Sequence, residues 1–436
     1  MISVKKLNKI GIIGIGYVGL PLSIELSRHF KIVAYDKNTK RIKQLKNNID
    51  KNKEFSRKIL NKTKINFTSL SKDLNDCQGY IVTVPTPLKR NYVPDLKYLK
   101  SATTLIGPKI KKDKFVIYES TVYPGCTNEY CLPILEKLSK LKSKNDLNSN
   151  GEFYVGYSPE RINPGDNINK LSKINKVVGS DEKNFTIFLK NFYKLITSGN
   201  IFTTTNLKTA EAAKIIENTQ RDLNIGLMNE LSYIFEKLNI NTFEVIKAAS
   251  TKWNFNYYEP GLVGGHCIGI DPYYLTYKSK EIGHDPKLIL AARSMNNSIE
   301  NRIVSKINQH RKLNDISIKK IKILIFGISF KENCSDIRNS LSLKIFDKIN
   351  KKYPNVFIYD PICQKEDLNN SKIKRKFLKK SKLFKNKYDI CMLSVPHDEI
   401  IKDFEKVTKN NITKKILIID IKNILKKNNS LNYFSL

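Results

Sequence analysis

Three glycines near the start of the chain limit what its first half can fold into. They belong to the motif Gly14-Ile15-Gly16-Tyr17-Val18-Gly19, which follows an apolar stretch at residues 9–15 and precedes a helical pattern at residues 20–28. Glycines at this spacing between a strand and a helix are typical of a βαβ unit that binds a dinucleotide. Gly14 permits the tight turn, Gly16 lets the backbone approach a pyrophosphate, and Gly19 lets the helix pack closely. Tyr17 and Val18 lie between the glycines and are assigned to the same cofactor loop.

An acid at the end of the next strand indicates which dinucleotide would bind. The apolar stretch at residues 31–36 ends in Asp36, whose carboxylate would accept hydrogen bonds from the ribose hydroxyls. A carboxylate repels a 2′-phosphate, so the motif favours NAD over NADP. Arg41 follows, and it either reaches the adenosine side or is a solvated helix residue. The alternative for the whole motif is a glycine-rich turn without a ligand.

The order of apolar stretches divides the chain into three segments. Residues 1–206 alternate strands and helices, which implies a parallel sheet with right-handed crossovers. Residues 207–312 show helical spacing for nearly a hundred residues, and residues 313–436 alternate again without the full glycine motif. We therefore predict an α/β protein with two doubly wound, Rossmann-like domains joined by a central helical dimerisation segment, and hence a homodimer.

Composition excludes several classes of protein. The net charge of +36 is carried by lysines spread along all 436 residues, without the clustered basic and aromatic residues that nucleic-acid binding needs. No apolar run reaches the roughly 18 residues of a membrane span, and no cleavage site follows the first lysines, so we expect a cytoplasmic protein. The seven cysteines form no C-x-x-C pair, which argues against a disulfide framework and against a metal site.

One of those cysteines lies in a loop suited to covalent catalysis. Cys267 follows Gly264, Gly265 and His266, and Asp271 comes four positions later. Because glycines lack a Cβ, a ligand can approach the backbone there, and Asp271 can lie near the sulfur without needing a helix to carry it. The alternative is that Cys267 is a small buried apolar residue.

Polar residues at three other places could complete a reaction site. Lys214 and Asn218 are i and i+4 on a predicted helix over residues 210–225, so they share one face and could stabilise a developing oxyanion or hold a water. Thr121 follows a buried strand over residues 115–118, at the sheet edge where such folds bind ligands. Glu160 lies in a proline-rich turn and could act as a base. The alternative for the helix is a solvated polar stripe.

In this order the motifs resemble those of the UDP-glucose/GDP-mannose dehydrogenase family, which oxidises a sugar nucleotide at C6 with NAD. The resemblance covers nearly the whole chain, from the glycine motif through residues 84–87, 120–122 and the Cys267 loop to residues 327–331 and 336–340. It implies that Cys267 is the nucleophile, that Lys214 stabilises the oxyanion, and that Asp271, Thr121 and Glu160 position or activate the hydrolytic water. It also implies that the third segment holds the UDP.

The resemblance assigns further residues to ligands. Thr86, Thr121 and Arg338 match cofactor contacts, the last near the nicotinamide. The positions that match substrate contacts are Glu160, Arg161, Lys214, Asn218, Tyr258, Pro260, Gly261, Gly264, Gly265, His266 and Lys331.

The loops also favour one branch of the family. Arg161 follows Glu160, and Ile270 stands where enzymes acting on UDP-glucose more often have a lysine. These forms look like the branch that acts on UDP-N-acetylglucosamine or UDP-N-acetylgalactosamine for capsule, Vi-type or O-antigen polysaccharides. UDP-glucose and UDP-N-acetylmannosamine remain alternatives. A two-electron hydroxyacid dehydrogenase, which would not need Cys267, is a more distant one.

Overall fold

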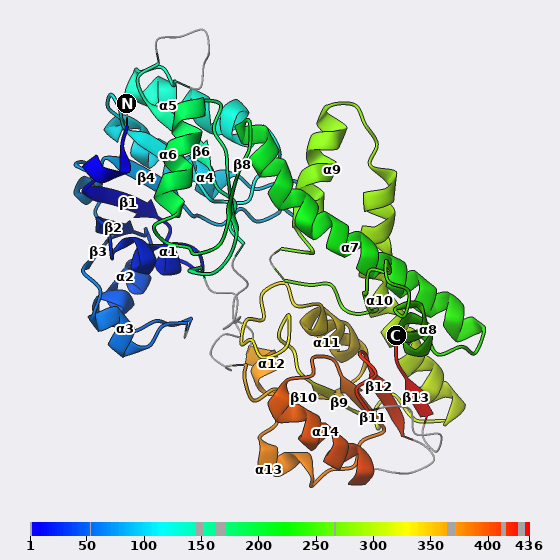
Figure 1. Ribbon diagram of the computed structural model, residues 1–436. Helices are drawn as coiled ribbons and strands as arrows, with labels where there is room; N and C mark the ends of the chain where they lie inside the picture. Colours follow the sequence, from blue (N-terminus) through cyan, green and yellow to red (C-terminus); the bar gives the residue numbers. More distant parts are fainter. Residues whose placement is uncertain are drawn as a thin grey trace. The chain divides into compact units, whose positions relative to one another are not determined.

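The computed structural model describes residues 2–52, 54–144, 151–161, 171–265, 267–363, 371–410, 416–425 and 432–436 (Figure 1). The chain forms two compact units, one made of Met1–Glu217 with Tyr273–Asp285 and the other of Asn218–Pro272 with Pro286–Leu436. The three segments expected from the sequence stay a prediction. Among the described residues, no helix combines the length and apolar character that a membrane span requires.

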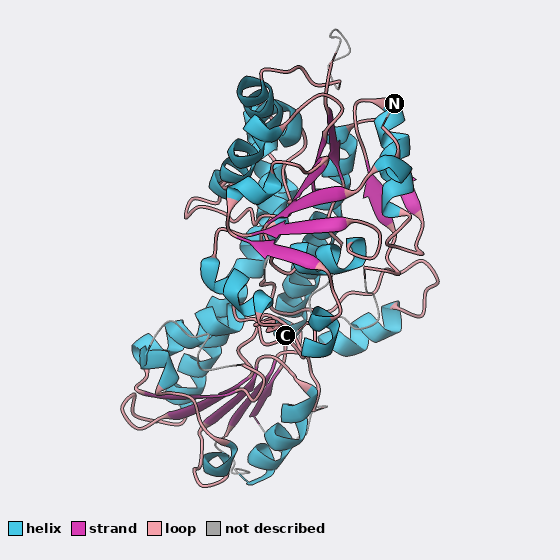
Figure 2. Cartoon of the chain, turned by 90° about the vertical axis from the view of Figure 1, so that its left-hand side faces the viewer, coloured by secondary structure: helices cyan, strands magenta, loops and turns pink. Residues whose placement is uncertain are grey.

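The first unit is built on a six-stranded sheet in which every neighbouring pair is parallel, in the order β3-β2-β1-β4-β5-β6. Figure 2 shows this sheet with helices on its sides. Its strands are β1 (Lys9–Ile13), β2 (Lys31–Tyr35), β3 (Ile65–Thr68), β4 (Gly79–Val82), β5 (Phe115–Tyr118) and β6 (Tyr154–Tyr157). This is the doubly wound order expected from the glycine motif, and it confirms the predicted parallel sheet.

Helices and turns connect these strands. α1 packs on β1 and β2, α4 on β4 and α6 on β6, and four phenylalanines from β5 and α6 stack at the centre of the core. The helices are α1 (Gly19–Leu26), α2 (Thr39–Lys46), α3 (Arg57–Asn61), α4 (Lys97–Ile106), α5 (Leu132–Ser139) and α6 (Lys183–Tyr193). Shorter elements are the turns η1 (Val4–Lys6), η2 (Ser71–Leu74), η3 (Gly107–Lys109) and η4 (Thr127–Cys131) and the parallel pair β7 (Lys176–Val178) and β8 (Ile201–Thr203).

The helical stretch is shorter than the sequence predicts. Its helices are α7 (Leu207–Lys237), α8 (Thr242–Ala249), α9 (Asp271–Glu281) and α10 (Lys287–Leu313). The described residues between α8 and α9 form turns and irregular loop, because Pro260 and four glycines within residues 261–269 disfavour a helix. The prediction of nearly a hundred helical residues is therefore wrong over this loop.

The second sheet, in the order β10-β9-β11-β12-β13, is also parallel throughout. Its strands are β9 (Lys322–Phe326), β10 (Asn355–Tyr359), β11 (Ile390–Leu393), β12 (Leu417–Asp420) and β13 (Asn432–Phe434), and its helices are α11 (Leu341–Lys352), α12 (Ser371–Lys374), α13 (Lys380–Leu383) and α14 (Asp398–Asn410). This confirms a second doubly wound domain.

The first turns of the two sheets are built alike. In the first sheet, Gly14 has a φ of +97° and Asp36 accepts a hydrogen bond from the backbone N–H of Ile15 at 2.9 Å. In the second, Gly327 has a φ of +76° and Asp360 accepts from the N–H of Ile328 at 2.9 Å. The two halves thus share a glycine after the first strand and an acid after the second.

Candidate active site

The glycine loop has the geometry that a dinucleotide turn requires. A Cβ added at Gly19 would lie 2.0 Å from the carbonyl oxygen of Gly14, so helix α1 approaches the turn too closely for any other residue. A Cβ added at Gly16 would meet no atom of the described residues within 4 Å, so its backbone faces open space among them. Tyr17 and Val18 are half-buried between these two glycines. The backbone is therefore free on the side where a phosphate would approach.

The side chains of Asp36 and Arg41 hold this loop in place through hydrogen bonds to its backbone. The Asp36 carboxylate accepts from the N–H groups of Ile15 at 2.9 Å and Asn38 at 2.8 Å. Arg41 donates from Nε to the carbonyl of Ile15 at 3.1 Å and from Nη1 to Asp50 at 2.8 Å, and its side chain is only 11% exposed. The solvated alternative for Arg41 is therefore wrong, since its stem is buried against the cofactor loop. Its other terminal nitrogen, Nη2, is buried and has no hydrogen-bond partner among the described residues.

Cys267 differs from the other cysteines in its exposure. Its side chain is exposed, whereas the remaining six cysteines are all buried. Burial raises the pKa of thiols such as Cys77, to about 11, so these are poor nucleophiles at neutral pH. The alternative that Cys267 is a buried apolar residue is wrong. Cys267 is the thiol that a ligand can reach.

Asp271 lies close to Cys267 along the chain and contacts its backbone. It is the first residue of α9 rather than part of a free loop, and its N–H donates to the carbonyl of Cys267 at 2.8 Å. An acid in the first turn of a helix is stabilised by the helix dipole, and Pro272 at the next position fits a helix start. A helix therefore does carry Asp271, although the spacing to Cys267 did not require one. The carboxylate is 2% exposed and accepts from the side-chain amide of Asn218 at 2.5 Å.

The polar face of α7 is buried. Lys214 and Asn218 are 7% and 9% exposed, so the alternative of a solvated stripe is wrong. Buried polar side chains need partners, and Asn218 finds one in Asp271. Within the second unit, Asn218 thus contacts Asp271 through its side chain, and Asp271 contacts Cys267 through the backbone. Lys214 lies one turn earlier than Asn218 on α7, in the part of that helix that belongs to the first unit.

The remaining reaction residues follow strands β5 and β6 of the first unit. Thr86 donates from its hydroxyl to the carbonyl of Thr121 at 2.6 Å and accepts at its own carbonyl from Tyr274 of α9 at 2.5 Å. Glu160 comes three residues after β6 ends and is half-exposed. Because β5 and β6 are parallel neighbours, Thr121 and Glu160 project from the same edge of the sheet. Next to Glu160, Arg161 forms an ion pair with Glu217 and donates to the carbonyl of Asn175 at 3.2 Å.

The residues expected at the substrate lie along the loop before Cys267. Tyr258 donates to the side chain of Gln220 at 3.1 Å, Pro260 is buried, and the backbone of Gly261 makes two hydrogen bonds to the Asn229 amide. Gly264 and Gly265 pack on the loop around Asn339 and on the ring of Phe330, where a Cβ at Gly264 would lie 2.8 Å from the Asn339 carbonyl oxygen. His266 lies outside the described residues.

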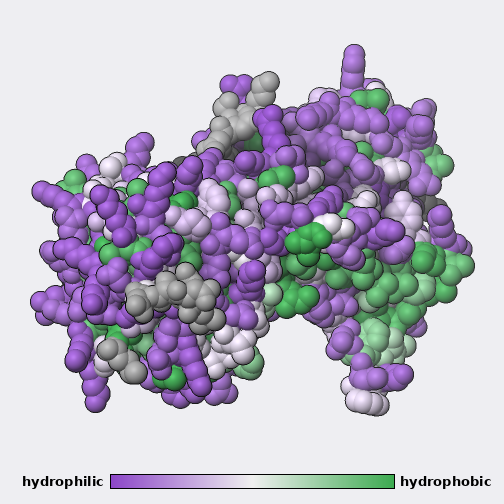
Figure 3. All heavy atoms as spheres, turned by 90° about the horizontal axis from the view of Figure 1, so that it is seen from above, coloured by the Kyte–Doolittle hydropathy of each residue, from purple (hydrophilic) through white to green (hydrophobic). Residues whose placement is uncertain are grey.

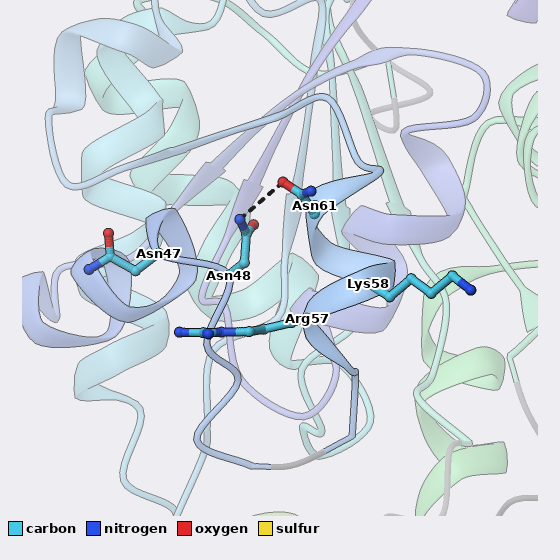
Figure 4. Close-up of a pocket in the computed structure, with 5 residues that line it drawn as sticks. All are labelled: Asn47, Asn48, Arg57, Lys58 and Asn61. Atoms are coloured by element: carbon cyan, nitrogen blue, oxygen red, sulfur yellow. Dashed lines mark hydrogen bonds between the residues drawn. The ribbon is translucent and has the colours of Figure 1, made fainter.

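Two expected ligand residues lie on the loop after β9. Lys331 has its ammonium 5.7 Å from the centre of the Phe330 ring. Arg338 is 55% exposed and pairs with Asp336 at 2.6 Å. A separate pocket of about 290 Å³ lies between the end of α2 and α3 and is lined by Asn47, Asn48, Arg57, Lys58 and Asn61 (Figure 4). That pocket contains none of the predicted site residues.

Sequence reasoning missed two buried carboxylates beside the site. Glu211, on α7 one turn before Lys214, accepts from the N–H groups of Gly125 at 2.5 Å and Thr127 at 2.9 Å. Glu119 pairs with Lys176 at 3.1 Å, and neither side chain has any exposed surface. Glu119 was visible beside Thr121, but no sequence signal joins it to Lys176, because such a pairing depends on the tertiary fold.

Comparison with known proteins decides the family. Three sequence profiles of the UDP-glucose/GDP-mannose dehydrogenase family match in order, namely the NAD binding domain over residues 8–197, the central domain over 208–298 and the UDP binding domain over 324–427. The chain is 42% identical to the UDP-N-acetyl-D-glucosamine 6-dehydrogenase of Salmonella typhi, over 90% of each chain. The chain belongs to the UDP-glucose/GDP-mannose dehydrogenase family.

Other members of this dehydrogenase family are also similar. The UDP-N-acetyl-D-mannosamine dehydrogenase of Methanocaldococcus jannaschii is 34% identical over 96% of this chain and 93% of the relative. The solved structure of UDP-D-ManNAc dehydrogenase from Pyrococcus horikoshii superposes with a TM-score of 0.85 at 28% identity, covering 98% of each chain. The protein is thus an NAD-dependent nucleotide-sugar dehydrogenase with a UDP-sugar as substrate.

NAD fits the glycine loop of this dehydrogenase. The open backbone at Gly16 suits a pyrophosphate, while Asp36 presents a carboxylate at the end of β2 that disfavours a 2′-phosphate. The buried Nη2 of Arg41, which has no partner within the part of the chain that the structure describes, is a donor that a ligand on this side of the loop would satisfy.

Proposed function

We propose that the protein oxidises C6 of UDP-N-acetylglucosamine or UDP-N-acetylgalactosamine to the uronic acid, in four electrons. The support is that the relative named for UDP-N-acetyl-D-glucosamine is 42% identical, against 34% for one named for UDP-N-acetyl-D-mannosamine. The Arg161 and Ile270 forms of the two loops point the same way. UDP-N-acetylmannosamine is the nearest alternative, because the similar solved structure carries that name. UDP-glucose is a further one.

The observation that carries the chemistry is the single exposed cysteine, Cys267. The C6 alcohol first loses a hydride and a proton to give an aldehyde. The Cys267 thiolate adds to the aldehyde carbon, and the hemithioacetal loses a second hydride to become a thioester. Water then attacks the thioester carbon, the C–S bond breaks, and the carboxylate and the free thiol result. Bound NAD⁺ supplies the hydride acceptor, so two are reduced for each sugar.

The buried polar groups have distinct roles in this scheme. Lys214 supplies a positive charge to the oxyanion that forms on C6, and its burial strengthens that interaction. Asp271 is held by Asn218 and by the start of α9, so its carboxylate has a fixed position at the end of the loop that carries Cys267. Asn218 in turn retains hydrogen-bonding capacity for the substrate. Lys214 acts on the reacting carbon, whereas Asp271 positions or activates the hydrolytic water together with Thr121 and Glu160.

Thr121 and Glu160 act on the hydrolytic water. Thr121 is fixed by the Thr86 hydroxyl, and Glu160 follows the neighbouring strand, so the pair could hold a water between them. Glu160 takes the proton as the water attacks. Arg338 is assigned to the nicotinamide end of the cofactor. Arg161, Tyr258, Pro260, Gly261, Gly264, Gly265, His266 and Lys331 are assigned to the UDP-sugar.

The test is the number of NADH molecules formed for each sugar consumed, followed at 340 nm with each UDP-sugar in turn. Two NADH from an N-acetylhexosamine would support the proposal, whereas two from UDP-glucose alone would overturn the substrate assignment. The Cys267→Ser variant should stop at or before the aldehyde. Full activity in that variant would refute the thioester.

We also propose a homodimer, formed through α7, and a role in surface polysaccharide synthesis. Leu227 and Ile234 on α7 and Leu238 just beyond it share one helix face and are 49%, 46% and 59% exposed. Figure 3 shows hydrophobic residues gathered toward the end where α7 stops and α8 lies. A monomer rarely leaves such a face in water. Replacing Leu227 with Glu should shift the sedimentation coefficient to that of a monomer, and an unchanged value would refute this interface.

A further inference from the structure

A buried ion pair adjoins the loops of two residues assigned to the hydrolytic water, Thr121 and Glu160. Lys176 Nζ is 3.1 Å from Glu119 Oε2, and both side chains are completely buried in the first unit. The same ammonium also donates to the carbonyl of Pro159 at 3.4 Å. One cation therefore touches two different loops.

The pair is held in a fixed arrangement by a third side chain. The hydroxyl of Tyr193, on α6, donates to the other oxygen of the Glu119 carboxylate. The Lys176 ammonium lies 4.7 Å from the centre of the Tyr193 ring. Burial and the neighbouring Glu119 keep the pKa of Tyr193 well above its usual value, so the hydroxyl keeps its proton and stays a donor. Both oxygens of Glu119 thus have defined partners.

The two loops that Lys176 joins are those of the proposed water site. Glu119 directly follows β5 and precedes Thr121 by two residues, and Pro159 directly precedes Glu160. Strands β5 and β6 pair in register, with Tyr118 opposite Tyr157, so the loops leave the sheet side by side. Main-chain contacts align the first residues beyond the strands, where Ser158 N–H donates to the Tyr118 carbonyl at 3.0 Å. Beyond Ser158, the ammonium of Lys176 links the two loops.

Stability alone does not account for a charged pair at this place. Removing two charges from water is so unfavourable that well-packed apolar residues often replace a buried ion pair without loss of stability. A pair that joins two functional loops can also set the spacing between them. Here the distance between Thr121 and Glu160 depends on the distance between the ends of β5 and β6.

We infer that Glu119 and Lys176 are positioning residues that set the spacing of Thr121 and Glu160 for hydrolysis of the thioester. The inference rests on the proposed function. In the step concerned, the water oxygen bonds to the thioester carbon, a water proton passes to Glu160, and the C–S bond breaks to release the Cys267 thiolate. The oxidation steps are complete before this point, so the pair should affect hydrolysis and leave the first hydride loss largely unchanged.

The test uses the double variant Glu119→Gln/Lys176→Met, which removes both charges together and leaves no unpaired ion in the core. Enzyme, NAD⁺ and UDP-N-acetylglucosamine are mixed and quenched, and the sugar bound to Cys267 is measured by intact-protein mass spectrometry. Because a displacement of about 1 Å can lower a rate about a hundredfold, we expect hydrolysis to slow at least about tenfold and the covalent adduct to accumulate. The NADH burst of the first turnover should stay within about twofold of wild type.

Two controls make the result specific. Lys114→Met removes an ammonium at the opposite end of β5, where it donates to the carbonyls of Asn75 and Lys109 at 3.1 and 3.0 Å. It should lower the unfolding temperature without adduct accumulation. Tyr193→Phe removes only the hydroxyl that holds Glu119, so it tests the same idea if the double variant does not fold, and adduct should accumulate to a smaller extent.

The outcomes separate this inference from the proposed function. Glu160→Gln should itself accumulate the adduct. If it does and the double variant and Tyr193→Phe do not, the positioning role is wrong and the proposed function stands. If the burst and hydrolysis fall equally in the double variant, its effect is merely structural and the inference is likewise wrong. If no adduct forms even in Glu160→Gln, the thioester is refuted and the inference with it.

Discussion

The Glu211→Gln variant should abolish the pH dependence that one buried carboxyl imposes on stability. Burial raises the pKa of Glu211 from 4.5 to about 7, against the effect of the N–H groups of Thr127 and Gly125 that donate to it. Glu211 has no exposed surface, so the loss of solvation is not screened by water. This carboxyl links α7 to the turn that follows Thr121.

The direction of this pH dependence follows from the number of protons that the folded and unfolded chains bind. Below pH 4.5 the Glu211 carboxyl is protonated in both the folded and the unfolded chain, and it contributes no pH dependence. As the pH rises from 4.5 to about 7, the unfolded chain loses this proton first, so the folded state becomes progressively less stable. Since each pH unit is worth about 1.4 kcal/mol, the total loss is about 3 kcal/mol, and it persists above pH 7.

Glutamine removes this pH-dependent loss of stability and introduces a smaller loss of stability that does not depend on pH. Its amide oxygen can accept from only one of the two N–H donors, and leaving the other unsatisfied costs about 1–3 kcal/mol. The variant should therefore be less stable than wild type at pH 5 and equally or more stable at pH 8. Urea unfolding of both proteins at these two pH values measures the difference.

A matched control separates the lost cap from the lost charge. Glu182 also accepts from two backbone N–H groups, those of Asn184 and Phe185, but it is half-exposed at the start of α6. Glu182→Gln reports the effect of losing such a cap without the burial. If the stability difference between wild type and Glu211→Gln is the same at pH 5 and pH 8, the reasoning from burial is refuted.

Three further predictions follow from the loops. Gly19→Ala should destabilise the fold because its Cβ would lie 2.0 Å from a backbone oxygen. Gly16→Ala should unfold at the wild-type temperature but show weaker NAD binding in calorimetry. If the two variants behave alike, this assignment of the two glycines is contradicted. A thiol reagent should modify one cysteine rapidly in the native wild type and none in Cys267→Ser, and fast labelling that survives in the variant would show another accessible thiol. Arg41→Met should raise the KM for NAD about tenfold with little change in kcat, and an unchanged KM would exclude Arg41 from the cofactor site.

Much of the fold could be predicted because the relevant signals are local. The glycine motif indicated strand, turn, helix and acid in order, and β5 was predicted at the bounds it has, because Phe115–Tyr118 is a short, wholly buried apolar run. The loop before α9 was included in the predicted helical segment, although Pro260 and the glycines that follow it disfavour a helix. The Asp271-Pro272 pair was a usable sign of a helix start.

The parts of the site that could not be predicted depend on distant partners. Lys176 is fully buried 57 positions away from the glutamate that neutralises it, and nothing in its neighbours distinguishes it from the many solvated lysines. Glu211 is similar, since its hydrogen-bond donors come from a turn that only tertiary packing brings to α7. Local patterns identified the residues assigned to chemistry, whereas those that hold them became visible only in the folded chain.

The repeated turn has a consequence for attempts to change cofactor preference. Asp36 and Asp360 each accept a hydrogen bond from the backbone N–H of the residue that follows the glycine in their own sheet. In the second sheet, however, α11 begins only at Leu341, well beyond Gly327, so no helix starts at that glycine. Each acid thus stabilises the backbone of the turn after the first strand, and this role does not require a bound ribose. Exchanging Asp36 for a neutral or basic residue to admit NADP would also loosen the loop that carries the pyrophosphate. A variant designed to bind NADP would therefore also need another acceptor for the Ile15 N–H. Without one, the change in cofactor selectivity would come with weaker binding of both NAD and NADP.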